Sequence, residues 1–129
     1  AFTTEGKLVV AREYRHPPRQ WLLSCPGGKI DPGESPEQAG QRELLEETGY
    51  GGGTYSLLGS VFPFPAVTDQ QIFFILATDV RYLQPPAVDP FELIQVELQT
   101  PEEVSARIAV HEPVDGILCT GLFLWKNQI

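Results

Sequence analysis

Two short apolar runs with a turn between them open the chain. Residues 7–12 (KLVVAR) and 20–25 (QWLLSC) are rich in branched and aromatic side chains, whereas residues 16–19 (HPPR) contain two prolines. Branched and aromatic residues favour strands, and consecutive prolines favour a turn. We therefore predict two strands joined by a turn, with residues 26–28 (PGG) ending the second strand.

A helix is expected at residues 36–48. Ser35 can cap its first turn, Pro36 suits the first helical position, and Gln38 completes a capping box. Gly49 fits the left-handed position that ends many helices. Both ends of this helix are therefore predicted from local sequence alone.

The rest of the chain alternates strand and helix patterns. Three further strands are expected, at residues 57–62, 71–80 and 93–98. The strand at 71–80 is almost wholly apolar and is expected at the centre of a sheet, whereas the prolines at 63–65 exclude a central strand there. A capping box at 100–103 opens a short helix, and Asp115 caps a last, apolar helix. This order predicts one α/β domain with a mixed sheet and helices on both sides.

The composition describes an acidic chain with enough apolar residues for a core. Its 129 residues are 42% hydrophobic, and 9 basic against 17 acidic residues give a net charge of −8. This charge argues against nucleic acid or an anionic membrane as a partner, but a bound cation would still allow a phosphorylated substrate. No apolar run approaches the roughly 20 residues of a membrane span, and the first residues lack a signal-peptide layout. We expect a cytoplasmic protein.

Residues 28–50 (GKIDPGESPEQAGQRELLEETGY) hold the main candidate chemistry. On the predicted helix, Glu43 lies three residues before Glu46 and four before Glu47, so the three carboxylates share one face. Like charges at these spacings repel, and carboxylate oxygens are preferred ligands of Mg²⁺ and Mn²⁺. The spacing indicates a divalent-cation site, although three glutamates alone would also fit a solvated acidic surface.

The loop before this helix adds to the pattern. Arg42 can reach back to Glu34 and form a bidentate pair that fixes the loop to the helix. The glycines at 27, 28 and 33 let the backbone approach a metal ion or a phosphate. A carbonyl of Gly27 or Gly28 is a candidate further ligand.

The same segment resembles the signature of the Nudix hydrolase family, G-x5-E-x7-R-E-U-x-E-E-x-G-U, where U is a bulky apolar residue. The matching residues are Gly28, Glu34, Arg42, Glu43, Leu44, Glu46, Glu47, Gly49 and Tyr50. Every fixed position is met, with an aromatic residue at the last position where an aliphatic one is usual. The resemblance implies a Nudix-type α/β/α sandwich with a mixed β-sheet, forming one domain over residues 1–129.

The resemblance also implies residue roles. The metal shell for Mg²⁺ or Mn²⁺ would draw on Glu43, Glu46, Glu47 and the carbonyl of Gly27. The expected catalytic residues within the signature are Arg42, Glu46 and Glu47, with structural support from Gly28, Glu34 and Gly49. The cation would neutralise a diphosphate, position an attacking water and lower the pKa of that water.

Within the family, the chain resembles the ADP-ribose pyrophosphatase and nucleotide-sugar hydrolase branch. Residues 10–15 (VAREYR) resemble its V-R-Q-Y-R strand, and residues 21–31 (WLLSCPGGKID) resemble its W-x-L-E-x-P-A-G-K-I-D segment. Residues 93–103 resemble its I-E-V-x-W-x-x-x-E-E-A segment. The branch implies a small nucleoside diphosphate derivative as substrate, cut into a nucleoside monophosphate and a sugar phosphate.

Residues outside the signature are candidates for substrate contact. Arg12 and Arg15 could contact substrate phosphates, because arginine pairs well with phosphate, but surface arginines on an edge strand are an equal alternative. Phe64 could stack on a base or ribose, with packing in the loop as the alternative.

The general base is expected just before the last strand. Glu92 holds the position where this branch often places that residue, and Asp89 is a competing candidate.

Two other functions stay open. One is hydrolysis of a dinucleoside polyphosphate or a (d)NTP; the coenzyme A type would need an upstream signature that is absent. The other is a non-catalytic Nudix-fold nucleotide-binding module, although such modules typically lose the glutamates kept here. The apolar C-terminal helix and the loop at residues 63–65 could also support a homodimer.

Overall fold

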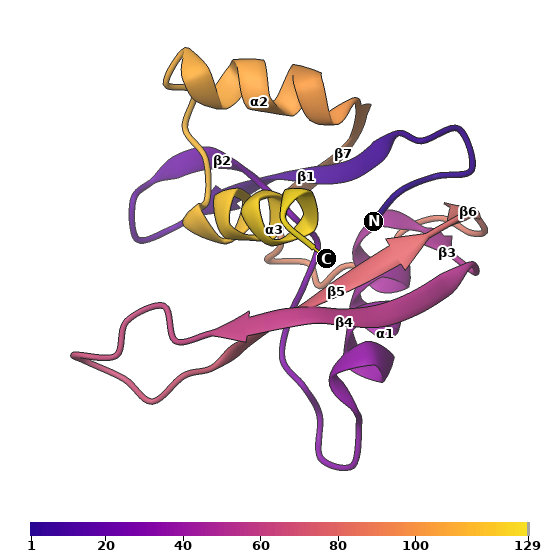
Figure 1. Cartoon of the computed structure of the whole chain (residues 1–129), viewed down its shortest axis with the longest axis horizontal. Coiled ribbons are helices and arrows are strands. Elements are labelled where there is room, and N and C mark those ends of the chain that lie inside the picture. Colours follow the sequence, from indigo (N-terminus) through magenta and orange to yellow (C-terminus); the bar gives the residue numbers. More distant parts are fainter. Residues whose placement is uncertain (129) are drawn as a thin grey trace.

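A three-stranded antiparallel sheet crosses the molecule in the computed structural model, which describes residues 1–128. Strand β1 (Leu8–Arg15) lies between β2 (Gln20–Ser24) and β7 (Ile94–Gln99) (Figure 1). Glu13 of β1 faces Leu22 on one side and Ile94 on the other. Because successive strand residues point to opposite faces, the alternation along β1 decides which of its side chains can face the helix at residues 36–48.

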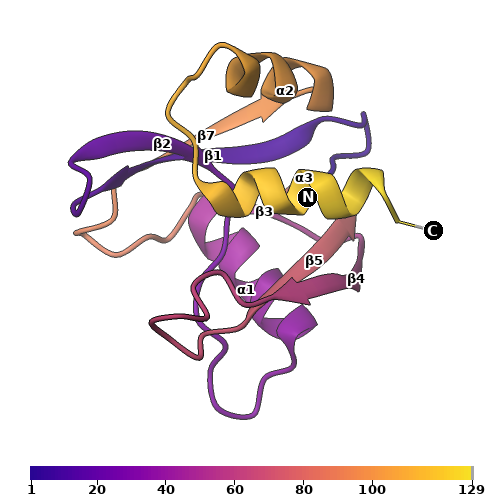
Figure 2. The ribbon, with the colours of Figure 1, turned by 60° about the vertical axis from the view of Figure 1, so that its left-hand side comes forward.

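One face of β1 contributes to a core that is shared with the two C-terminal helices. Helix α2 (Pro101–Ala109) lies above the β1–β2 ribbon in Figures 1 and 2, and helix α3 (Gly116–Lys126) lies below it. Val10 of β1 forms a buried cluster there with Val104 and Leu122. The predicted caps are confirmed, since Thr100 begins α2 with a capping box and Asp115 caps α3.

The opposite face of the sheet packs against helix α1 (Pro36–Thr48). Val9 of β1 forms a second buried cluster with Leu44 of α1 and with Val80. The alternation along β1 therefore divides the core into two parts, one on each side of the sheet.

The remaining strands form two small antiparallel pairs. These are β4 (Thr54–Val61) with β5 (Ile72–Thr78), and β3 (Tyr50–Gly51) with β6 (Arg81–Tyr82). The pairing between named strands is antiparallel, and parallel pairing occurs as the isolated bridges Thr3↔Val80 and Leu23↔Val114. The whole is an α/β sandwich in which helices and strands alternate in layers.

The prediction that the apolar strand at 71–80 is central in a sheet is wrong. Among the named strands β5 pairs with β4 alone. Its apolar sequence has another cause, because helices cover both of its faces. Gly40 of α1 lies against Ile75, and Gly121 of α3 lies against Phe74. The hydrophobic run therefore reflects two helix contacts rather than two strand neighbours.

Among the residues described, no helix has the length and apolar character that a membrane span requires.

Candidate active site

Helix α1 has the predicted bounds and presents the acidic residues of the signature. Ser35 accepts a hydrogen bond from the N–H of Gln38, and the Gln38 side chain accepts one from the N–H of Ser35. Gly49 ends the helix in the left-handed region with φ 78°, and a Cβ there would strike the carbonyl of Gln84. The helix therefore begins and ends where its local sequence requires.

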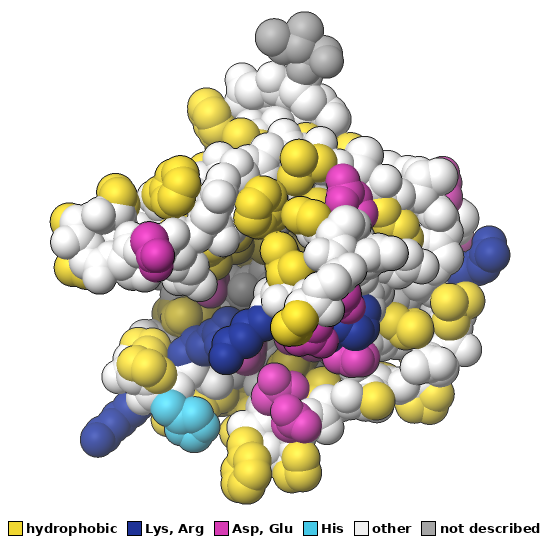
Figure 3. Space-filling model, turned by 90° about the horizontal axis from the view of Figure 1, so that it is seen from below, with side chains coloured by type: hydrophobic (Ala, Val, Ile, Leu, Met, Phe, Trp, Pro, Cys, Tyr) yellow, Lys and Arg dark blue, Asp and Glu magenta, His cyan; other side chains and the backbone are white. Residues whose placement is uncertain are grey.

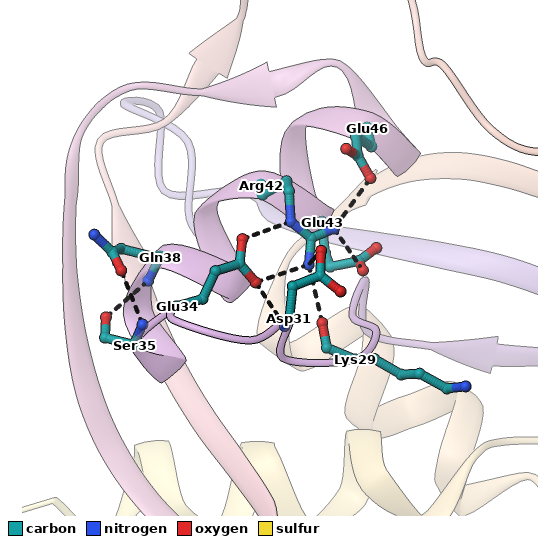
Figure 4. A network of polar contacts seen from close by, with 8 residues as sticks. All are labelled: Lys29, Asp31, Glu34, Ser35, Gln38, Arg42, Glu43 and Glu46. Carbon is teal, nitrogen blue, oxygen red and sulfur yellow. Dashed lines mark hydrogen bonds and ion pairs between the residues drawn. The ribbon is translucent and has the colours of Figure 1, made fainter.

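Arg42 is the centre of a polar network between α1 and the preceding loop (Figure 4). Its Nε donates to Glu34 Oε1 at 2.7 Å, and its Nη2 donates to Glu34 Oε2 at 3.0 Å. The predicted bidentate pair is thus present. Nη2 also donates to the carbonyl of Lys29 at 2.9 Å and lies 3.5 Å from Asp31 Oδ2. These contacts fix the loop against the first turns of the helix.

The same guanidinium also contacts two signature glutamates. Arg42 Nη1 donates to Glu43 Oε1 at 2.9 Å and to Glu46 Oε2 at 3.3 Å. One arginine therefore offsets the repulsion that the closely spaced carboxylates would otherwise exert on each other.

Glu34 is held in its charged form by this network. The hydrogen bond from Arg42, with a further one from the N–H of Asp31, lowers the pKa of Glu34 to about 2. The carboxylate therefore stays ionised over the whole physiological pH range.

Gly28 is required by the position of Glu43. A Cβ at residue 28 would collide with the carboxylate of Glu43, because the loop backbone passes directly over this side chain. The glycine predicted from the signature is therefore a close-contact residue, and any side chain there would displace Glu43.

Glu47 is the most buried of the signature glutamates, with 7% of its surface exposed. Its Oε2 accepts a hydrogen bond of 2.9 Å from the N–H of Gly27. Burial raises the pKa of Glu47 to about 8; the Gly27 N–H opposes this shift, and the charges of Glu43, Glu13 and Glu92 add to it. Among residues 1–128, no basic side chain forms an ion pair with Glu47.

These donors suit a divalent cation chemically, but they do not converge on one point. Within the described residues, no three Asp, Glu, His or Cys side chains stand close enough together to hold a metal ion in this arrangement. Arg42 engages Glu43 and Glu46, while Gly27 turns its N–H toward Glu47. A cation would give the buried Glu47 the positive partner that it lacks.

Strand β1 separates the two arginines that were expected to contact phosphate. Arg15 lies on the α1-facing side, where its Nη1 is 2.9 Å from Glu13 Oε1. Arg12 lies on the opposite side, 3.9 Å from Glu97 Oε1 on β7. The structure therefore does not bring Arg12 together with the signature glutamates, because residues three apart on a strand point to opposite faces.

Glu13 was missed by the sequence analysis. It lies on the same strand face as Arg15, and its charge contributes to the raised pKa of Glu47. The alternation of residues 9, 11, 13 and 15 was the signal that could have identified it, since Val9 packs against Leu44 of α1.

The candidate bases lie in the loop before β7. Glu92 accepts a hydrogen bond from the N–H of Asp89 at 3.2 Å, and its own N–H donates to the carbonyl of Asp89 at 2.9 Å. The N–H of Ala87 in the same loop donates to the carbonyl of Glu46 at 2.7 Å, which fastens the loop to α1. The charge of Glu92 also contributes to the raised pKa of Glu47.

Phe64 lies apart from these contacts, in the loop between β4 and β5 that extends away from the body in Figure 1. It is 63% exposed. Figure 3 shows acidic and basic side chains next to one another beside a hollow on the lower face, with hydrophobic side chains around them.

Comparison with known proteins identifies the family. The family model described as NUDIX domain matches residues 1–118, and the chain therefore belongs to the Nudix family. Proteins of this family generally use divalent metal ions.

Individual relatives agree with this assignment. The chain is 29% identical over 117 residues to an ADP-ribose pyrophosphatase of Bacillus subtilis, covering 90% of this chain and 63% of the relative. It is 47% identical over 53 residues to a protein of the same organism named as a putative 8-oxo-dGTP diphosphatase, covering 41% of this chain and 35% of that protein.

A solved structure of an ADP compounds hydrolase superimposes with a TM-score of 0.75 at 25% identity, covering 93% of this chain and 64% of that one. The chain thus spans less than two thirds of the length of these three relatives.

Proposed function

We propose that the protein hydrolyses the diphosphate bond of a nucleoside diphosphate linked to another moiety, using Mg²⁺ or Mn²⁺. ADP-ribose or a nucleotide sugar is the preferred substrate, and the products are a nucleoside monophosphate and a sugar phosphate. The observation that carries this proposal is Glu47, which is buried beside other carboxylates and has no cationic partner within residues 1–128. A divalent ion would stabilise such a carboxylate and would also attract a diphosphate.

The signature residues have separate roles in this proposal. Glu43, Glu46 and Glu47 would hold the cation. The carbonyl of Gly27 would be a further ligand after a rotation of the loop that carries this residue, whose N–H now faces Glu47. When bound, the cation supplies charge neutralisation and lowers the pKa of a bound water. Arg42 keeps the glutamates and the glycine loop in register through contacts that already exist.

Two residues outside the signature complete the proposal. Arg15 would bind a substrate phosphate, because its guanidinium lies on the α1-facing side of β1 and is 46% exposed. Glu92 would accept the proton of the attacking water, since its loop is fastened to α1 and its charge reaches Glu47. Arg12 is not assigned a phosphate contact, because it lies on the other face of the sheet.

Product analysis over a substrate panel tests the proposal. ADP-ribose, a nucleotide sugar, a dinucleoside polyphosphate and dNTPs are each incubated with protein, with Mg²⁺ present and absent. We expect the protein to release AMP and ribose 5-phosphate from ADP-ribose only when Mg²⁺ is present. Hydrolysis of dNTPs in preference to ADP-ribose would favour the second candidate function, a (d)NTP hydrolase. The 47% identity over 53 residues to a protein named as a putative 8-oxo-dGTP diphosphatase supports this candidate. If the folded protein hydrolyses none of these compounds, a non-catalytic nucleotide-binding module would be favoured.

A homodimer in the cytoplasm remains part of the proposal. Its support is the exposure of Phe64 in the β4–β5 loop and of Phe123 on α3, which is 66% exposed. Sedimentation that shows only monomer at micromolar concentrations would remove the dimer.

A further inference from the structure

Glu13 occupies an unusual place for a charged side chain. It lies in the middle of the antiparallel sheet, flanked across the strands by Leu22 and Ile94, and its side chain is 14% exposed. A carboxylate between apolar neighbours loses hydration, and it is retained at low cost only when a cation pairs with it.

Arg15 supplies that cation from the same strand. Its Nη1 lies 2.9 Å from Glu13 Oε1, and among residues 1–128 Glu13 is the only carboxylate within ion-pair distance of Arg15. A guanidinium has five N–H donors in a fixed plane, so this pair leaves other donors free for an anion. An arginine that a carboxylate already orients loses less conformational entropy when it binds a phosphate.

The surroundings place this pair at the edge of the candidate active site. Val9, on the same face of β1 as Glu13 and Arg15, packs against Leu44 of α1, the helix that carries the signature glutamates. An unpaired carboxylate here would repel a diphosphate. Paired with Arg15, it instead contributes orientation without net negative charge.

We propose that Glu13 is a positioning residue, which holds the Arg15 guanidinium on the α1 side of β1 so that Arg15 binds a phosphate of the diphosphate substrate. This inference rests on the proposed function, because it assigns the phosphate contact of the same site. Glu13 contacts neither the substrate nor the metal ion in this scheme.

Binding and kinetics of matched variants test the inference. The dissociation constant of α,β-methylene ADP is measured by calorimetry with Mg²⁺, together with KM and kcat for ADP-ribose. Glu13→Ala and Arg15→Ala should each weaken binding and raise KM about tenfold or more, as expected for a lost charge-assisted contact, with kcat changed less than about twofold. The double variant should bind no more weakly than Arg15→Ala alone. Glu13→Gln should recover most of the affinity, because its amide oxygen still accepts from Arg15.

Controls separate positioning from other effects. Arg81→Ala on β6 and Glu102→Gln on α2 change the net charge by the same amounts away from this site and should leave binding unchanged. Circular dichroism establishes that each variant is folded. Wild-type affinity in Glu13→Ala, or effects that multiply in the double variant, would overturn the inference. Weaker Mn²⁺ binding in Glu13→Gln, equal to that in Glu47→Gln, would also overturn it by making Glu13 a metal ligand. If only the proposed function is wrong, the wild-type protein should still bind the analogue but should hydrolyse none of the substrates.

Discussion

Arg42 makes the acidic face of α1 stable before any cation binds. It contacts Glu34 in the loop and both Glu43 and Glu46 on the helix, so one side chain supports the loop and also offsets repulsion between carboxylates. Glu47 is outside this network and depends on the N–H of Gly27. The residues that support the site and the residue that most needs a cation are therefore different.

The pair formed by Glu34 and Arg42 should be visible in acid unfolding. The folded-state pKa of Glu34 lies at about 2, below its ordinary value of 4.5. A lowered pKa stabilises the fold above pH 4.5, and this contribution is lost as the pH falls from 4.5 through about 2. Without divalent cations, Glu34→Gln should therefore lose less of its melting temperature than the wild type between pH 5 and pH 2.5. Scanning calorimetry measures this, with Glu102→Gln as a control; parallel curves would contradict the pairing.

Glu47 is expected to matter for turnover rather than for folding. Glu47→Gln keeps the size of the side chain and an acceptor for the Gly27 N–H, but it removes the charge that would hold a cation. We expect kcat to fall by about two orders of magnitude or more, with an unchanged circular dichroism spectrum. Near wild-type turnover in steady-state assays with Mg²⁺ would refute the ligand assignment.

Helices and strands whose bounds depend on residues nearby in the sequence could be predicted. The bounds of α1 follow from Ser35, Gln38 and Gly49, which act within one turn of the helix. The place of β5 was not predictable, because an apolar strand looks the same whether its neighbours are strands or helices.

Contacts of the candidate site also differ in whether the sequence could predict them. The pair formed by Arg42 and Glu34 spans eight residues along the chain, and this spacing indicated it. The separation of Arg12 from Arg15, and the role of Glu13, depend on which face of β1 meets α1, and that is set by tertiary packing.

The contact between the glycine loop and α1 should matter for activity. In Gly28→Ala the new methyl group would occupy the space of the Glu43 carboxylate, which would have to move. We expect turnover to fall about tenfold or more, on the scale seen when a small misplacement disturbs catalytic geometry. Gly116→Ala is the matched control, because a Cβ there meets open space. Equal activity of the two variants would show that the close contact has no functional role.

The whole molecule carries a formal net charge of −8, and its candidate site includes the buried carboxyl group of Glu47. Any cation that binds the folded chain alone stabilises it, by about 2.7 kcal/mol at 100 times its dissociation constant. We therefore expect Mg²⁺ to raise the melting temperature of the wild type by several degrees, measured at constant ionic strength with Na⁺ as the control. Glu43→Gln and Glu47→Gln should lose most of this shift. An equal shift in all three proteins would indicate cation binding elsewhere on the acidic surface.

Direct counting of bound Mn²⁺ by electron paramagnetic resonance tests the central claim, that the glutamates of α1 bind the divalent ion. Titration of the wild type should show at least one saturable site, and Glu47→Gln should weaken that site about tenfold or more. Saturable binding of equal affinity in both proteins, or no saturable binding in the wild type with a nucleotide present, would contradict it.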